Sequence, residues 1–312
     1  MSSCYAIINY ASESVNNNIH LVMEAINNME EFFSKPIIFA NPQTLTNTQT
    51  KSWQSVDAQY EEAKKHKIII VFGGDGTKTY ILNRIIEDRI HPCFWGISCG
   101  TMNIGPYSTP IDLFLKPQIG KSEKTKLNAI MSEINGKKYY SFIDTVITTT
   151  CVTKVNGKVS QISAAKIMEG IRQQDIPAIV GNLNTKILVN IGTSSIIIPP
   201  IDSTMSIGVA LISKCLSANI MAGGADPAAC IGYKWGVIVS DFPLTWADPT
   251  VQDMQQRAIK THFLPLKDND TVEIDNCVSG AYCVIDGNAV SPVKRISISY
   301  CKQIIEINKL KE

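Results

Sequence analysis

The first 125 residues alternate between short apolar runs and longer amphipathic stretches. The apolar runs "CYAIINY", "PIIFAN", "IIIVF" and "PCFWGIS" have the length and composition of strands. Between them, apolar residues recur at helical spacing over residues 15–33, 56–67 and 77–90. Strands that alternate with helices favour a parallel sheet covered on both faces. We therefore predict an α/β N-terminal domain over residues 1–125.

The pattern changes after the polar stretch "KPQIGKSEKTK". Strand-like runs separated by Asn-Gly, Gly and Pro follow, at residues 137–163, 185–201, 235–241, 270–276, 280–291 and 295–307. Asn156-Gly157 is the strongest hairpin signal, because a type I′ turn requires positive φ at both central residues. We predict a mainly β, substrate-binding domain over residues 126–290. A C-terminal strand segment, 291–312, is expected to pack back on the first domain.

Composition narrows the possible partners and the location. With 29 basic and 28 acidic side chains the net charge is +1, so the chain lacks an electrostatic footprint for nucleic acid or an anionic membrane. The nine cysteines form no C-x-x-C pair and have no histidines at zinc-ligand spacing, which is typical of reduced thiols. No basic leader and no run of 18 apolar residues is visible. We expect a soluble, cytoplasmic protein.

Candidate chemistry gathers in "VFGGDGT", where a buried strand meets a glycine-rich turn. Gly73, Gly74 and Gly76 let backbone N–H groups approach a ligand closely, and Thr77 is expected to open a helix whose N-terminus favours anions. Asp75 is either the cap of a tight turn or part of a phosphate cradle. In a cradle it would repel phosphate, unless it binds a screening metal or accepts a proton from an attacking hydroxyl. The second interpretation indicates phosphoryl transfer.

The word "GGDGT", between an apolar strand and a helix, resembles the signature shared by NAD kinases, diacylglycerol and sphingosine kinases, and acetoin-catabolism X proteins. The following segment "WGISCGTMNIGPYST" is similar to the second glycine-rich segment of that superfamily. Its Gly100, Thr101 and Asn103 fall in the order of the lipid-kinase "GTxN". The resemblance implies that these residues and the 73–77 turn bind the donor nucleotide.

The likeness extends into the second half of the chain. "IIIPPIDSTMSIG" is similar to an NAD-kinase stretch, with Asp202 in place of a glycine and Ser203 and Thr204 matching. Asp286-Gly287 falls at that family's late "DG", although turn preferences alone also favour a hairpin there. In "FIDTVI", Asp144 and Thr145 stand where NAD kinases carry the Asn-Glu pair that holds the acceptor. The resemblance implies that the residues matched here bind the acceptor: Asp144, Thr145, Asp202, Ser203, Thr204 and Asp286.

The function implied is that of an ATP- and Mg²⁺-dependent kinase of the NAD-kinase type, acting on a hydroxyl of NAD or a related nucleotide-like acceptor. Asp75 would be the catalytic general base or a carboxylate associated with the metal. The family also implies a homo-oligomer, a dimer or tetramer. Two alternatives stay open: a kinase for a lipid or another small alcohol, and a non-catalytic nucleotide-binding protein.

Two further stretches bear on this interpretation. Gly120-Lys121-Ser122 ends like a P-loop, but Leu115 stands where the first glycine of that motif should be, so we interpret "GKS" as a solvated linker. Residues 214–235 have no family counterpart and read as an inserted surface loop. Because Asp75 is expected at a cleft, we expect its replacement by asparagine to leave folding nearly intact.

Overall fold

The computed structural model describes residues 3–40, 53–99, 105–116, 118–148, 150–155, 158–163, 195–198, 234–240, 261–275, 277 and 281–310. These residues divide into two compact units. Unit 1 contains the described residues up to 127 and those from 303 onward, and unit 2 contains the described residues between 128 and 302. The boundaries that the sequence suggests, at 125 and 290, stay a prediction.

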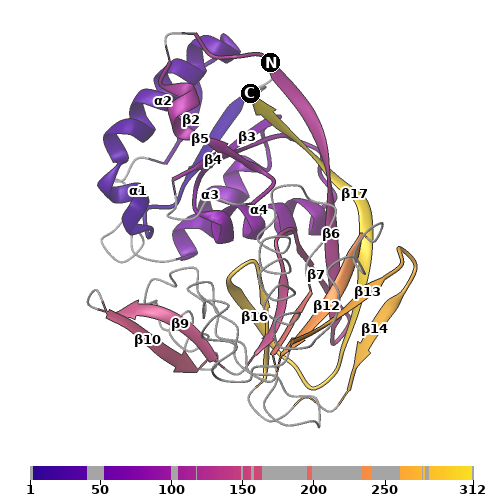
Figure 1. Cartoon of the computed structure of the whole chain (residues 1–312). Helices are drawn as coiled ribbons and strands as arrows, with labels where there is room; N and C mark the ends of the chain where they lie inside the picture. Colours follow the sequence, from indigo (N-terminus) through magenta and orange to yellow (C-terminus); the bar gives the residue numbers. More distant parts are fainter. Residues whose placement is uncertain are drawn as a thin grey trace. The chain divides into compact units, whose positions relative to one another are not determined.

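Unit 1 is built on a parallel sheet whose strands have the order β2-β1-β3-β4-β17, with β5 also paired to β4. Its elements are β1 (Cys4–Ile8), α1 (Glu13–Asn17), α2 (Ile19–Phe33), β2 (Ile37–Phe39), α3 (Trp53–Ala63), β3 (Ile68–Gly73), α4 (Asp75–Glu87), β4 (Cys93–Ser98), β5 (Ser108–Pro110), the 3₁₀ helix η2 (Ile111–Phe114) and the end of β17 (Ile296–Leu310). Figure 1 shows α1 and α2 together, apart from α3 and α4.

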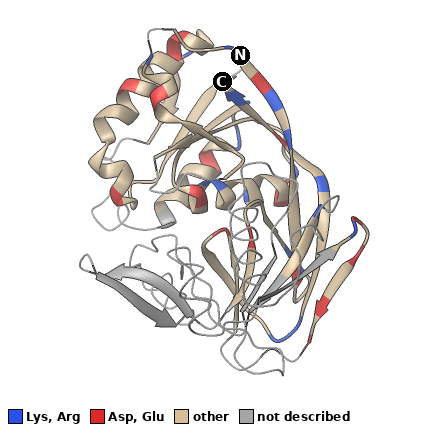
Figure 2. Cartoon of the chain, viewed as in Figure 1, with Lys and Arg blue, Asp and Glu red and all other residues tan. Residues whose placement is uncertain are grey.

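Both faces of this sheet are buried. Ile70 and Phe72 of β3 pack in one cluster with Ala25, Ile26 and Met29 of α2. Successive side chains of a strand point to opposite faces, and the intervening residues of β3 are also inaccessible to solvent. The central strands β1, β3 and β4 carry no charged residue, whereas α1, α2 and α3 carry acidic residues and α4 and β17 carry both signs (Figure 2). The predicted α/β domain with a parallel sheet is confirmed.

Two helix boundaries differ from the sequence-based expectation. The single helix predicted over 15–33 is divided at Asn18 into α1 and α2. Helix α4 begins at Asp75 rather than at Thr77, with Gly74 as its N-cap. The glycine-rich turn is therefore shorter than expected, because the first helical turn already includes the aspartate.

Unit 2 consists of antiparallel strands, as the mainly β prediction requires. One sheet has the order β13-β12-β11-β8-β15-β16, and β9 and β10 form a separate hairpin. The elements are β7 (Lys137–Ser141), β8 (Thr145–Thr148), β9 (Thr150–Val155), β10 (Lys158–Ser163), β11 (Ser195–Ile198), β12 (Trp235–Ser240), β13 (Thr261–Leu266), β14 (Thr271–Ile274), β15 (Tyr282–Ile285) and β16 (Asn288–Pro292). The hairpin predicted around residues 156–157 is present, since Val155 pairs with Lys158, although the two turn residues lie outside the described ranges.

The stretch "GKS", predicted as a solvated linker, is exposed to solvent, but a strand begins at its last residue. This strand, β6 (Ser122–Ile134), forms a hairpin with β7 and lies beside β17 in the sheet order. Its first three residues are solvent-exposed, which explains why they lack the apolar pattern of a strand. Like β17, β6 contributes residues to both units.

Candidate functional site

The glycine-rich turn joins the carboxyl end of β3 to the amino end of α4. Gly73 closes the strand, and a Cβ placed on it would lie 2.8 Å from the Cβ of Thr77, so a side chain at 73 would displace the helix. Gly74 is extended, with φ −75° and ψ 178°, and caps the helix without a side-chain hydrogen bond. The first N–H groups of a helix have no intrahelical acceptor, and the helix dipole places partial positive charge there. The turn therefore offers an anion-binding backbone.

Asp75 is the first residue of α4, and its carboxylate turns toward the segment 105–108. Oδ1 accepts the backbone N–H of Gly105 at 3.2 Å and the hydroxyl of Ser108 at 3.1 Å. The ammonium of Lys78 lies 3.5 Å from the same oxygen, and the side chain of Asp75 is only 11% exposed. The hydroxyl of Tyr107 donates to the carbonyl oxygen of Asp75. The aspartate is thus held in place rather than projecting as a free cap.

Thr77 is buried, and its hydroxyl accepts a hydrogen bond of 2.7 Å from the side-chain amide of Asn9. Asn9 follows β1, the strand adjacent to β3, so the carboxyl ends of two neighbouring parallel strands meet at the loop. Sequence analysis missed Asn9. The available signal was a polar residue directly after the apolar run "AII", at the end of a strand where parallel sheets place their ligands.

Lys78 is also missing from the sequence-based site. Its side chain is fully buried, and Nζ donates to the hydroxyls of Ser108 at 2.6 Å and Ser98 at 3.4 Å. Burial lowers the pKa of Lys78 from its ordinary value, while the negative charge of Asp75 acts in the opposite direction. In the sequence this lysine looks like one of the polar positions of an amphipathic helix, so no pattern distinguishes it.

Small residues make room for this cluster. A Cβ on Gly96 of β4 would lie 2.5 Å from the carbonyl oxygen of Tyr107 and 2.9 Å from Cδ of Lys78. The ring of Tyr107 lies 5.8 Å from the ammonium of Lys78, and its hydroxyl shares a hydrogen bond of 2.7 Å with Thr79. The glycine in "WGIS" is therefore required by the close approach of the lysine and the 107 backbone.

Unit 2 contains two acidic residues from the predicted set, Asp144 and Asp286. The carboxylate of Asp286 accepts the backbone N–H groups of Phe142, Ile143 and Asp144 at 2.9–3.2 Å, and Asp286 is only 6% exposed. The backbone N–H of Asp286 in turn donates to the carbonyl oxygen of Asp144. Asp286-Gly287 forms the turn between β15 and β16, with φ values of 45° and 85°, so the hairpin interpretation of this dipeptide also holds.

The carboxyl group of Asp144 has unusual electrostatics. Burial, together with the weaker effect of the neighbouring negative charge of Asp286, raises its pKa to about 7. Such a group exchanges protons near neutral pH, which suits general acid–base chemistry. Thr145, the next residue, is fully buried in β8, where its hydroxyl is hydrogen-bonded with Ser141 at 2.7 Å and Ser132 at 3.3 Å.

The remaining predicted site residues lie outside the described ranges. These are Gly100, Thr101 and Asn103 of the second glycine-rich segment and Asp202, Ser203 and Thr204 of "PPIDST". Within unit 1 the structure brings Gly73, Gly74, Asp75, Gly76 and Thr77 together with Asn9, Lys78, Ser98 and Ser108. Asp144, Thr145 and Asp286 form a group of their own in unit 2.

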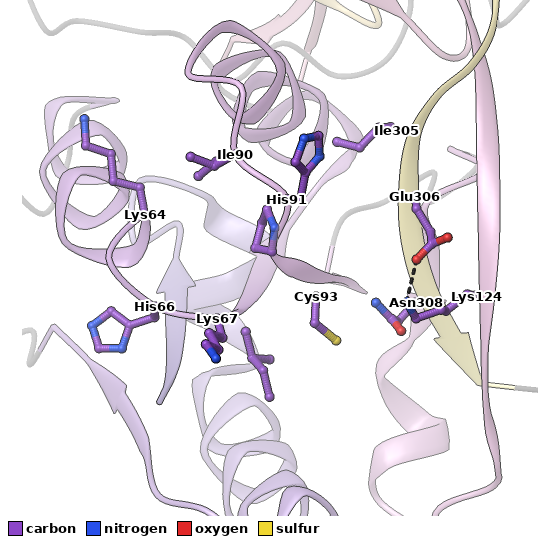
Figure 3. A pocket seen from close by; sticks show the side chains of 12 residues that line it. Lys64, His66, Lys67, Ile90, His91, Cys93, Lys124, Ile305, Glu306 and Asn308 are labelled. Carbon is purple, nitrogen blue, oxygen red and sulfur yellow. Dashed lines mark hydrogen bonds and ion pairs between the residues drawn. The ribbon is translucent and has the colours of Figure 1, made fainter. Parts of the chain in front are cut away.

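Unit 1 also has a pocket of about 530 Å³ at the other end of the strands (Figure 3). Its lining includes Ile68 and Cys93, the first residues of β3 and β4, together with Lys64, Lys67 and Lys124. Two of these lysines already have acidic partners: Lys64 pairs with Glu61, and Lys124 pairs with Glu306. Ligands of open α/β sheets bind at the carboxyl ends of the strands, so the turn at 73–77 is the better candidate site.

Among the described residues, no group of three or more His, Cys, Asp or Glu side chains is arranged to hold a metal ion. No described helix has both the length and the apolar character needed to cross a bilayer.

Residues 23–135, about a third of the chain, match the family model of the diacylglycerol kinase catalytic domain. An uncharacterised protein of Archaeoglobus fulgidus is 23% identical over 209 residues, which cover 67% of this chain and 63% of the relative. The chain thus spans less than two thirds of the length of that relative.

Solved structures of similar extent come from Bacillus anthracis. One is a diacylglycerol kinase with 15% identity and a TM-score of 0.42, and the matched region covers 98% of this chain and 96% of the kinase chain. A second, provisionally assigned as a diacylglycerol kinase, has 13% identity and a TM-score of 0.49, with coverages of 98% and 97%. The segment that carries the "GGDGT" loop belongs, on its family match, to the superfamily of diacylglycerol kinases and NAD kinases.

Proposed function

We propose that this protein is an ATP-dependent kinase that transfers a phosphoryl group to an alcohol. The observation that carries the proposal is the 73–77 turn, where N–H groups at the start of a 13-residue helix and a fixed carboxylate follow a buried parallel strand. Such a turn binds the phosphates of a nucleotide without any covalent nucleophile. The match of residues 23–135 to a kinase catalytic domain supports the same reaction class.

In the proposed reaction the acceptor hydroxyl oxygen bonds to the terminal phosphorus of ATP, and the bond from that phosphorus to the bridging oxygen of ADP breaks. The hydroxyl proton passes to a carboxylate, and ADP leaves with the electron pair of the broken bond. Asp75 is the first candidate for this proton acceptor. Asp144 is the second, because its pKa of about 7 allows it to take up a proton near neutral pH.

Mg²⁺ enters this proposal as part of the MgATP substrate, where it neutralises charge on the phosphates. Asp75 is the one described carboxylate at the turn, and its Oδ1 already accepts Gly105 and Ser108. The described residues therefore do not form a resident metal site at the turn, and contact between Asp75 and the nucleotide's metal remains a proposal.

Two acceptor classes are proposed. The first is NAD or a related nucleotide-like alcohol, for which the stretch around residues 202–204 is the sequence-based argument. The second is a lipid alcohol of the diacylglycerol type, favoured by the family match and by Asp144 and Thr145 in place of the Asn-Glu pair of NAD kinases. In both cases Asp144 and its neighbours would contact the acceptor, and Gly100, Thr101 and Asn103 the donor.

The test is a transfer assay with γ-³²P-labelled ATP and Mg²⁺, offering NAD in one reaction and diacylglycerol in detergent micelles in another. Label is expected in NADP or in phosphatidic acid, and this result assigns the acceptor class. Asp75→Asn should lose the transfer, whereas the exposed Asp112→Asn in η2 is the matched control and should keep it. Binding of ATP without labelling of any alcohol, including nucleosides and sugars, would contradict the kinase and support a non-catalytic nucleotide-binding protein.

A further inference from the structure

The side chain of the lysine that directly follows "GGDGT" points into the protein interior. Lys78 belongs to the first turn of α4, yet its side chain is fully buried and reaches Ser98 at the end of β4 and Ser108 in β5. Lysine is almost never fully buried unless it is paired, because removing an ammonium group from water is costly. The fold must therefore provide compensation for this charge.

The compensation is a short chain of hydrogen bonds that ends on Asp75. Nζ of Lys78 lies 2.6 Å from Oγ of Ser108, and that hydroxyl lies 3.1 Å from Oδ1 of Asp75. The ammonium has only protons to give, so Ser108 accepts from it and donates its own proton to the carboxylate. The direct separation of Nζ and Oδ1 is 3.5 Å. Lysine and aspartate are therefore coupled both by charge and through one hydroxyl.

Among the described residues, no other anion of comparable strength acts on Lys78. Besides Asp75, the titratable groups that act on Lys78 are the thiol of Cys99, whose pKa burial raises to about 11, and the ammonium of Lys309 on β17. The thiol is therefore neutral at pH 7, and Lys309 has the same charge as Lys78. Asp75 is the partner that compensates the buried cation.

This pairing changes the charge of the turn. A lone carboxylate next to the helix N-terminus would cancel the positive potential of the helix dipole there and would repel a polyphosphate. With Lys78 behind it, the pair is neutral, and the N–H groups of the first helical turn retain their positive potential. The sequence alone suggested two ways to tolerate Asp75, a metal ion or a proton, and the structure supplies a third.

We propose that Lys78 is the internal counter-ion of the "GGDGT" loop, so that the loop binds the phosphates of the donor even without a divalent cation on Asp75. This inference rests on the proposed function, because it concerns how the same loop takes its nucleotide. Lys78 acts through Asp75 and is thus a positioning residue, not one that contacts the substrate.

The test measures binding of ATP and of inorganic triphosphate by titration calorimetry, with Mg²⁺ and with EDTA. Wild type should bind both ligands in EDTA. Lys78→Met, which leaves Asp75 uncompensated, should bind at least about tenfold more weakly in EDTA, with a smaller loss in Mg²⁺. Lys78→Arg should retain part of the affinity. Lys67→Met is the control, because it also removes one positive charge but lies before β3, at the end of the strand opposite the glycine-rich turn. It should bind both ligands with the affinity of wild type.

The double variant Asp75→Asn with Lys78→Met separates charge from structure. It removes both charges, so the loop is again neutral and should regain most of the affinity that Lys78→Met loses in EDTA. The double variant also tests the inference if Lys78→Met alone fails to fold. A folded double variant that does not bind triphosphate in EDTA would overturn the inference.

Other outcomes distinguish the inference from the proposed function. Wild-type affinity of Lys78→Met in EDTA, or a wild type that transfers phosphoryl groups but binds no triphosphate in EDTA, would overturn the inference alone. A wild type that binds neither ligand under either condition and labels no alcohol would remove the kinase proposal and the inference with it.

Discussion

Two aspartates followed by glycine, Asp75 and Asp286, are buried by opposite means. Asp75 faces an ammonium group and a hydroxyl, so its charge is cancelled locally. Asp286 is held by three backbone N–H groups, which satisfy its oxygens but add no positive charge. Burial raises the pKa of the neighbouring Asp144, and the uncancelled negative charge of Asp286 adds to that shift. The same dipeptide thus begins a helix at residue 75 and forms a hairpin turn at residue 286, and the electrostatics at each place depend on which donors the fold brings to the carboxylate.

The largest effect is expected for Asp75→Asn. Turnover should fall by roughly 10²-fold or more if Asp75 accepts the proton. Contrary to the expectation from sequence, folding should also suffer, because Lys78 would stay buried without its anion; breaking such a pair costs about 3–5 kcal/mol. Urea unfolding and the transfer assay measure the two effects. A variant with unchanged stability would show that the pair contributes nothing to folding.

Asp286→Ala should destabilise unit 2 without directly disturbing unit 1. Three backbone N–H groups of residues 142–144 would lose their acceptor, and each unsatisfied buried donor costs about 1–3 kcal/mol. Asp286→Asn keeps one acceptor oxygen and should lose less. Urea unfolding measures the loss, and hydrogen exchange of the 142–144 amides locates it. Equal protection of these amides in wild type and Asp286→Ala would contradict the assigned role.

Asp144 predicts a dependence of stability on pH. Its folded-state pKa of about 7 is raised above the value of 3.8 for an unfolded aspartate, so the folded protein binds this proton more tightly. Its contribution to stability is complete below about pH 4 and is lost as the pH rises through 7. The total loss should be a few kcal/mol at most. Chemical unfolding from pH 4 to 8 measures it, and Asp144→Asn should flatten that slope. A parallel slope in wild type and variant would place the titration elsewhere.

The smallest effects are expected at two glycines that serve different purposes. Gly73→Ala would press a methyl group against Thr77 and should cost about 1–3 kcal/mol. Gly136→Ala meets nothing within 4 Å, but its φ of +77° strains any side chain, so about 1 kcal/mol is expected. Thermal unfolding of both variants checks the order. A greater loss of stability for Gly136→Ala than for Gly73→Ala would mean that the side chain of Thr77 can move to accommodate the added methyl group.

The sequence was sufficient for features that repeat along the chain. Periodicity located β1, β3, β4 and the helices between them, because both faces of the parallel sheet are buried and leave long apolar runs. It missed β6 entirely, because the exposed first residues of that strand have no alternation, and it placed the start of α4 two residues late. Local patterns of apolar residues reveal which positions are buried. The exposed start of β6 is a strand because it lies beside other strands in the sheet, which such patterns do not show.

For the site, the sequence identified Asp75 and its glycines but not what surrounds them. Asn9 and Ser108 reach the turn from other strands, and only the strand order brings them there. Lys78 was invisible for a different reason. A lysine in an amphipathic helix is normally solvated, and its burial depends on the absence of a side chain at Gly96. The elevated pKa of Asp144 likewise requires Asp286, which is distant in the sequence.

The last strand has a consequence for how the protein forms. Asn308 of β17 pairs with Trp95 of β4, and its side-chain amide contacts the carbonyl oxygen of Phe94, while Leu310 lies in the core of unit 1. The sheet that carries the glycine-rich turn is therefore completed by a strand that is translated long after β4. Until then β5 pairs with β4 only over Gly96–Ser98, so the edge at Trp95 waits for β17, and such long-range pairing slows folding. A fragment ending at residue 125 would leave that part of the edge without its partner strand.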